Sequence, residues 1–103
     1  MTVLLPPVIR GESVTLRRWT IGYTNDLASI RDRSAVQLRT WLPEAFAELH
    51  DVDRFIATAS ARFDAGSEFD FAMFDASMAL VGQCSMKAVD LRTAEIGYWI
   101  CSD

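Results

Sequence analysis

Glu95 has the chemistry and the sequence setting expected of a catalytic group. It is the one carboxylate in an otherwise apolar closing segment, residues 94–101. Burial in such a segment would raise its pKa toward neutrality and suit it to general-base work. The alternative is a solvated position, because Glu95 alternates with Ala94 and Ile96 and could point outward.

The other reactive side chains favour structural roles. His50, the only histidine, lies in a polar stretch, residues 48–53, which is typical of a surface position. Cys84 and Cys101 are too few for a disulfide scaffold and are expected to be small buried thiols; no bond between them is predicted. We find no metal-ligand spacing, no phosphate-binding P-loop and no Ser/His/Asp arrangement.

Hydrophobic periodicity predicts the helices that would position these groups. A first helix is expected from about residue 24, and a short helical piece covers residues 35–40. The WLP sequence of residues 41–43 ends that piece, because proline disfavours helix in the residue before it. The clearest helix runs over residues 51–65, and Gly66 is placed to end it in a left-handed conformation.

Period-two alternation predicts strands over residues 14–19, 68–74, 80–89 and 94–101. The second of these has one strongly apolar face, and Gly82 in the third marks a bulge or a close approach between backbones. Short turns at residues 75–77 and 90–93 join the last three strands into an antiparallel meander. The expected fold is therefore α/β (α+β), ordered β-α-α-β-β-β, with helices packed on an antiparallel sheet in a single domain, residues 1–103.

Composition excludes several functional classes. The chain has 103 residues, half of them hydrophobic, and a net charge of −4, with ten basic residues that form no cluster. Nucleic-acid binding through phosphate contacts is therefore not expected. No apolar run approaches the length of about 18 residues that spans a bilayer, and the apolar start is too short for a signal peptide. We expect no membrane partner and a cytoplasmic location.

Four segments, in order along the chain, carry a resemblance to a known family. They are LRRW at residues 16–19, WLP at 41–43, FDFAM at 69–73 followed by LVGQ at 80–83, and AEIGYWI at 94–100. Together they resemble the N-terminal portion of the GNAT superfamily of N-acetyltransferases, in its RimJ/RimL-like branch. The resemblance implies a GNAT-like fold and transfer of acetyl from acetyl-CoA to a primary amine, on a protein N-terminus or a small molecule.

The resemblance also implies roles for the cosubstrate side of the site. Glu95 would deprotonate the amine, directly or through a water. A backbone N–H near Trp99 or Ile100 would polarise the thioester carbonyl, and the backbone of Trp99, Ile100 and Cys101 would pair with the pantetheine amides. The alternative is that these backbone groups are ordinary members of a sheet.

On the acceptor side, Trp41 and Phe46 would line an amine pocket, or else belong to an aromatic core. Asp70, with Glu68, would face the amine, or else lie on a solvated strand face.

In the family, the strand corresponding to residues 94–101 leads into a glycine-rich loop and a helix that hold the cofactor pyrophosphate. No such loop follows in this sequence, so we expect a domain that lacks the C-terminal half of the fold. The alternative function is a catalytically inactive interaction domain that self-associates, or a half-protein joined by a complementing C-terminal half. An edge strand exposing Ile96, Tyr98 and Ile100 would favour a homo-oligomer.

Overall fold

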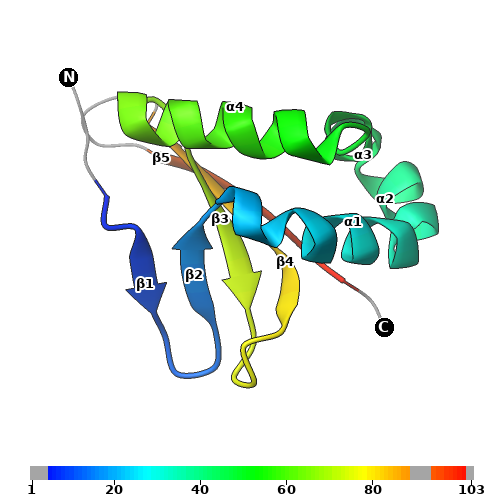
Figure 1. Ribbon diagram of the computed structural model, residues 1–103, viewed down its shortest axis with the longest axis horizontal. Coiled ribbons are helices and arrows are strands. Elements are labelled where there is room, and N and C mark those ends of the chain that lie inside the picture. The colour runs from blue at the N-terminus through cyan, green and yellow to red at the C-terminus, as the bar shows by residue number, and fades with distance from the viewer. Residues whose placement is uncertain (1–4, 89–93, 102–103) are drawn as a thin grey trace.

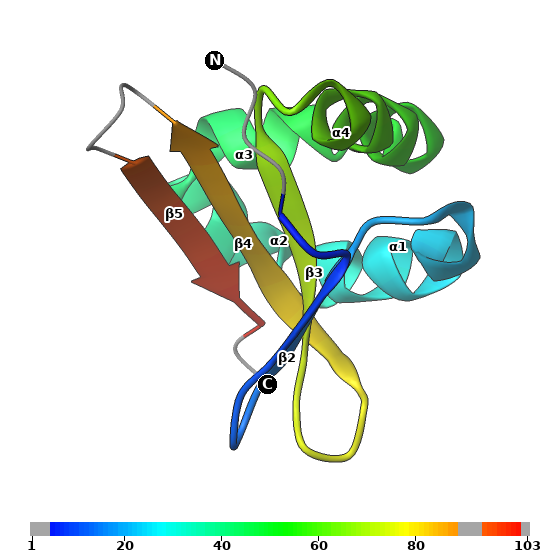
Figure 2. The ribbon, with the colours of Figure 1, turned by 90° about the vertical axis from the view of Figure 1, so that its left-hand side faces the viewer.

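The computed structural model describes residues 5–88 and 94–101, which form a five-stranded antiparallel sheet with helices packed against it. Each strand pairs with its neighbour in sequence, so the sheet order is the chain order, and β5 and β1 lie at opposite edges (Figures 1 and 2). The elements are β1 (Val8–Arg10), β2 (Thr15–Arg18), the 3-10 turn η1 (Ile21–Tyr23), α1 (Thr24–Arg33), α2 (Ala35–Trp41), α3 (Pro43–Glu48), α4 (Val52–Ala65), β3 (Phe69–Phe74), β4 (Leu80–Ala88) and β5 (Ala94–Ile100).

The α+β architecture and the strand meander predicted from the sequence are confirmed. Helix α4 follows its pattern closely. The Asp51 side chain accepts a hydrogen bond from the Arg54 backbone N–H at 3.1 Å at its start, and Gly66 ends it with φ of 71°. Glycine suits that left-handed position because it carries no Cβ.

Among the strands and α-helices, two elements were not predicted. Strand β1 pairs with β2 through a short hairpin. Helix α3 begins at Pro43 and is separated from α2 by a single residue, Leu42. The same proline explains both helix boundaries, because its ring disfavours helix in the preceding residue yet its fixed φ suits the first turn of a new helix. The predicted turn at residues 90–93 lies outside the described residues.

Strand β3 is buried on both faces, whereas the sequence predicted a single apolar face. One face, with Ala72 and Phe74, joins the large core formed with the helices. The other face, with Phe69 and Phe71, packs with Phe63 of α4 in a second cluster.

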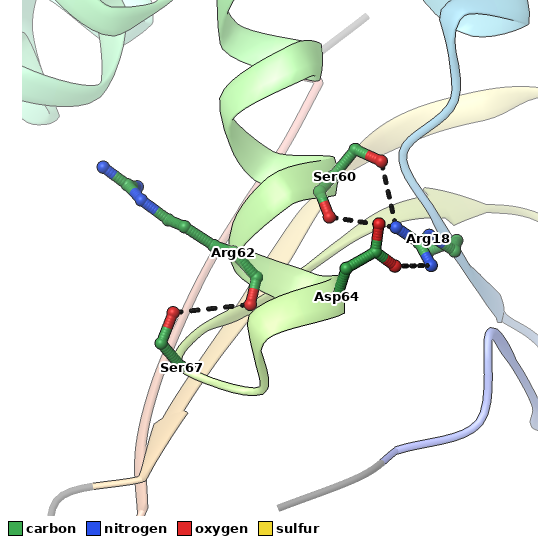
Figure 3. Close-up of polar contacts among 5 residues, drawn as sticks. All are labelled: Arg18, Ser60, Arg62, Asp64 and Ser67. Carbon is green, nitrogen blue, oxygen red and sulfur yellow. Dashed lines mark hydrogen bonds and ion pairs between the residues drawn. The ribbon is translucent and has the colours of Figure 1, made fainter. Parts of the chain in front are cut away.

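An arginine on β2 ties the sheet to the C-terminal end of α4 (Figure 3). The Arg18 guanidinium donates to the Asp64 carboxylate at 2.8 Å and to both the carbonyl and the hydroxyl of Ser60, at 3.0 and 2.9 Å. It also lies 4.4 Å from the centre of the Phe63 ring. Because these contacts use several donors of one planar group, they fix the position of α4 relative to β2.

Gly82 lies where the backbones of β4 and β5 leave no room for a side chain. The register of β4 against β3 shifts opposite Met73 and Phe74, and Gly82 lies across from Ile100. A Cβ at residue 82 would collide with the Trp99 carbonyl oxygen and would lie 3.0 Å from the Ile100 Cα. The predicted close approach at Gly82 is therefore confirmed, and the obstructing atoms belong to backbone that cannot rotate away.

We predict that Gly82→Ala will destabilise the fold by about 1–3 kcal/mol, the usual cost of forcing extra atoms into a packed site. Gly97→Ala is the matched control, because a Cβ at residue 97 meets nothing within 4 Å. Urea unfolding followed by circular dichroism measures both variants. Equal stabilities for the two variants would contradict the close approach.

Candidate functional site

A surface cavity of about 470 Å³ lies between the α2–α3 junction and strands β4 and β5. Its helical wall carries two carboxylates, Glu44 and Glu48, and a largely exposed indole, Trp41, at 76% exposure. Its sheet wall includes the polar side chains of Gln83 and Ser85. The full lining is Trp41, Leu42, Pro43, Glu44, Ala45, Glu48, Gln83, Ser85, Gly97, Tyr98 and Trp99. Carboxylates beside an aromatic face suit a cationic ligand.

Local sequence explains how this cavity forms. The α2–α3 junction at Leu42-Pro43 leaves Trp41 at the surface rather than in the core. Trp99, in contrast, is buried in the large core and forms part of the opposite wall. The junction and β5 thus face each other across the cavity.

Next to the sheet wall, on β3, is a buried carboxylate: Asp70 lies opposite Ser85 of β4 and is only 5% exposed. The Ser85 hydroxyl donates to Asp70 Oδ1 at 2.5 Å, and the Gln83 amide donates to Ser85 Oγ at 3.1 Å. Burial raises the pKa of Asp70 above its ordinary value; the Ser85 hydrogen bond lowers it, and the nearby charge of Glu68 raises it further. The net effect is a carboxyl group that binds its proton more tightly than an exposed one.

A second cavity of about 340 Å³ lies on the other side of Asp70, between α3, α4 and β3. Its lining includes the carboxyl groups of Asp70 and Asp51, the guanidinium groups of Arg54 and Arg62, and the imidazole of His50. Glu48 borders both cavities. Asp70 and Ser85, paired on neighbouring strands, therefore connect two water-accessible cavities on the helix-covered face of the sheet.

The sequence-predicted acceptor residues separate in the structure. Trp41 lines the first cavity and Asp70 the second. Phe46 is partly buried against the large core, with the Arg39 guanidinium 5.8 Å from its ring centre, and it lines neither cavity. The solvated strand face considered for Asp70 is wrong, because Asp70 is only 5% exposed and shares its cavity with residues of α3 and α4.

Glu95 is exposed to solvent and lies opposite Lys87 on β4. It lines neither of these cavities. Ser85 was not singled out from the sequence, although its spacing from Gln83 already placed both on one face of the predicted strand.

The free edge of β5 presents backbone groups of alternate residues. The Cys101 N–H donates to the Val81 carbonyl at 2.6 Å, and the register pairs Trp99 with Gln83. Since hydrogen-bonded and non-hydrogen-bonded pairs alternate in an antiparallel ladder, Trp99 also directs its N–H and C=O toward β4. The corresponding groups of Tyr98 and Ile100 therefore point to the open edge, where the described residues place no further strand.

Side chains of the same residues form an apolar surface on β5. Ile96, Tyr98 and Ile100 are 63%, 68% and 48% exposed.

Cys84 and Cys101 are half-buried thiols without a disulfide. Within residues 5–88 and 94–101, no three side chains come together as metal ligands, and no helix is long and apolar enough to cross a membrane.

Comparison with known proteins identifies the architecture. The family model described as an acetyltransferase (GNAT) domain matches residues 13–103. No curated protein sequence gives a match. Among solved structures, the microcin C7 self-immunity acetyltransferase MccE, in complex with acetyl-CoA and AMP, is 19% identical with a TM-score of 0.78, covering 96% of this chain and 57% of that one.

Two further structures are similar. RimJ from Mycobacterium smegmatis, in complex with CoA-disulfide, is 24% identical with a TM-score of 0.72, covering 86% of this chain and 46% of that one. A putative ribosomal-protein-serine acetyltransferase from Vibrio cholerae is 20% identical with a TM-score of 0.74, covering 94% of this chain and 57% of that one. The chain thus spans about half the length of these proteins.

The raised pKa of Asp70 predicts a specific dependence of stability on pH. The folded state holds this proton more tightly than the unfolded chain, so the free energy of unfolding should fall as pH rises from about 3.8 through the folded-state pKa, then level off. Asp70→Asn stays neutral and should lack this fall, so its stability relative to the unaltered chain should increase with pH. Urea unfolding from pH 4 to 8 measures this.

Asp32→Asn is the control, because Asp32 is an exposed carboxylate paired with Arg31 on α1. Its pH profile should retain the fall assigned to Asp70. A profile for Asp70→Asn that runs parallel to that of the unaltered chain would show that Asp70 titrates like an exposed carboxylate.

Proposed function

Because this chain belongs to the acetyltransferase (GNAT) domain family, we propose that it provides the acceptor cavity and the pantetheine-binding strand of an acetyl-CoA-dependent N-acetyltransferase. The acceptor is a primary amine, on a protein N-terminus or a small molecule. One observation carries the proposal: Tyr98 borders the carboxylate-lined cavity and also presents its backbone groups at the open edge of β5. An amine in the cavity and a thioester along the edge would meet at this strand.

The open edge supports a division of roles between neighbouring residues. Both Trp99 and Ile100 were candidates to polarise the thioester carbonyl. The Trp99 N–H is directed toward β4, so Ile100 is the better donor to an external acceptor. In this proposal, the open-edge groups of Tyr98 and Ile100 also pair with pantetheine amides, as in the addition of a strand to a sheet.

The helical wall of the cavity supports the choice of a cationic acceptor. Glu44 and Glu48 bring negative charge to the side facing β5, and Trp41 offers an aromatic face at the rim. An ammonium group placed between them gains from charge attraction and from the ring quadrupole. Orientation of the amine toward the thioester is then the main contribution of this wall to the rate.

Calorimetry with acetyl-CoA tests the cosubstrate half of the proposal. We expect micromolar to millimolar binding of acetyl-CoA and of S-acetylpantetheine, and no binding of adenosine 3′,5′-bisphosphate, because β5 offers contacts to the pantetheine arm. Ile100→Pro, which removes the open-edge N–H, should weaken binding about tenfold, the effect of losing a hydrogen bond of about 1.4 kcal/mol. Ile100→Ala, which keeps the N–H, should weaken it much less. No heat at millimolar acetyl-CoA would overturn the proposal for this chain.

The exposed edge favours a second candidate function, self-association. The open-edge groups of Ile96, Tyr98 and Ile100 can pair with the same groups of a second copy in an antiparallel register centred on Tyr98. That register sets Ile96 against Ile100 of the second copy, so apolar side chains meet on one face. It sets Glu95 against Cys101, so no like charges oppose each other. The arrangement would be a two-fold symmetric dimer with a continuous sheet.

Sedimentation at several concentrations tests the dimer. We expect the mass to rise with concentration, and Tyr98→Lys to keep the chain monomeric because a lysine at an edge opposes strand pairing. Val36→Lys is the matched control, since Val36 is a similarly exposed apolar residue far from β5 on α2. Acetyl-CoA should shift the equilibrium toward monomer, because both partners use the same backbone groups. A monomer at every concentration would contradict this function.

A further inference from the structure

We propose that Ser85 and Asp70 form a proton relay that takes the proton of the acceptor amine out of the cavity between α3 and β5. Ser85 Oγ would accept a proton from the bound ammonium while its own hydroxyl proton passes to Asp70. The inference rests on the proposed acetyl transfer and assigns its base, which the resemblance had placed at Glu95. Ser85 touches the amine and is the catalytic residue; Asp70 acts through it.

Hydrogen-bond geometry fixes the direction of the relay. Ser85 Oγ accepts a hydrogen bond from the Gln83 amide at 3.1 Å and lies 2.5 Å from Asp70 Oδ1. A carboxylate only accepts, so the single hydroxyl proton of Ser85 points to Asp70. One lone pair of Oγ remains after the bond from Gln83. Ser85 lines the first cavity, so that lone pair is available to a ligand there.

The position of Asp70 gives the proton a destination. Asp70 lines the second cavity, so the relay runs from β4 to β3 along the helix-covered face of the sheet, from one cavity to the other. The charges of Glu68 before β3, Arg62 of α4 and Glu48 of α3 act on Asp70, and the charge of Asp70 in turn acts on the Cys84 thiol of β4. Asp51, Arg54 and His50 complete the ionisable lining of the second cavity, where water can receive the proton.

Burial distinguishes Asp70 from the other carboxylates near the acceptor cavity. Glu44, Glu48 and Glu95 are exposed to solvent, whereas Asp70 is buried. Because burial raises the pKa of Asp70, its carboxylate is a stronger base than a solvated one, while the Ser85 hydrogen bond and the charge of Arg62 favour the charged form. A stronger base accepts a proton from a bound ammonium more readily than a solvated carboxylate does.

The reaction balances with two protons leaving the nitrogen. The ammonium gives its first proton through Ser85 to Asp70, and the freed lone pair then attacks the thioester carbon. The new C–N bond forms as the C–S bond breaks. The nitrogen loses its second proton as the amide is completed, and the departing thiolate takes up one proton through water. Asp70 returns its proton to the water of the second cavity, so the net products are the acetylated amine, CoA and one proton.

The test is acetyl transfer from acetyl-CoA to alaninamide, measured from pH 5 to 9. In the unaltered chain, kcat/KM should rise with pH through the pKa of Asp70. Asp70→Asn and Ser85→Ala should each lower kcat about 100-fold, with KM for alaninamide nearly unchanged, since general-base catalysis contributes about 10²–10⁴-fold. Ser85→Thr, which keeps the hydroxyl, should restore most of the rate. The double variant should be no slower than either single one, because the two residues act as a unit.

Ser67→Ala and Asp32→Asn are the matched controls and should retain the full rate, since both residues are exposed and neither lines one of the two cavities. Transfer that persists in Ser85→Ala and Asp70→Asn would overturn the relay and leave the acetyltransferase proposal standing. A purely structural role would show as losses that add in the double variant and are not restored by Ser85→Thr, which also overturns the relay. Failure of the unaltered chain to transfer acetyl at all would overturn the proposed function, and the relay with it.

Discussion

The burial of β3 on both faces is the constraint on which the rest of the structure depends. All six of its residues are buried, and alternate side chains enter the two apolar clusters. Since a slip of one residue would exchange the two faces, Asp70 would then enter the phenylalanine cluster without a partner. The apolar pattern of β3 therefore sets its register against β4, and that register places Asp70 opposite Ser85.

Burial of the Asp70 carboxylate costs it part of its hydration, and the contacts of the fold offset that desolvation only in part. The Ser85 hydroxyl supplies one hydrogen bond, and Arg62 lies close enough to favour the charged form, but burial still dominates the pKa of Asp70. An apolar residue at position 70 would remove that desolvation cost. The proposed proton relay accounts for an acid at position 70 that is hydrogen-bonded to the Ser85 hydroxyl beside the first cavity. Packing alone does not account for it.

The sequence specified the elements better than their surroundings. Helix α4 was predictable because its caps and its apolar spacing are local features, and β3 to β5 because alternation is local too. Alternation indicates two faces of a strand but not what covers them, so it could not separate the buried Asp70 from the exposed Glu95. The difference arises from α3 and α4, which cover Asp70, and α3 itself was missed because Pro43 was interpreted only as the end of a helix.

The open edge of β5 has two proposed uses that exclude each other. Backbone groups of Tyr98 and Ile100 can pair with a pantetheine arm or with a second copy of the strand, and each N–H serves one acceptor well. A dimer through this edge would therefore close the cosubstrate site while leaving the acceptor cavity and the Ser85–Asp70 pair in place, because those lie on the opposite side of β5 toward β4. Occupation of one edge thus decides between catalysis and association, and the free-energy difference between the two states depends on the concentrations of cosubstrate and of the chain itself.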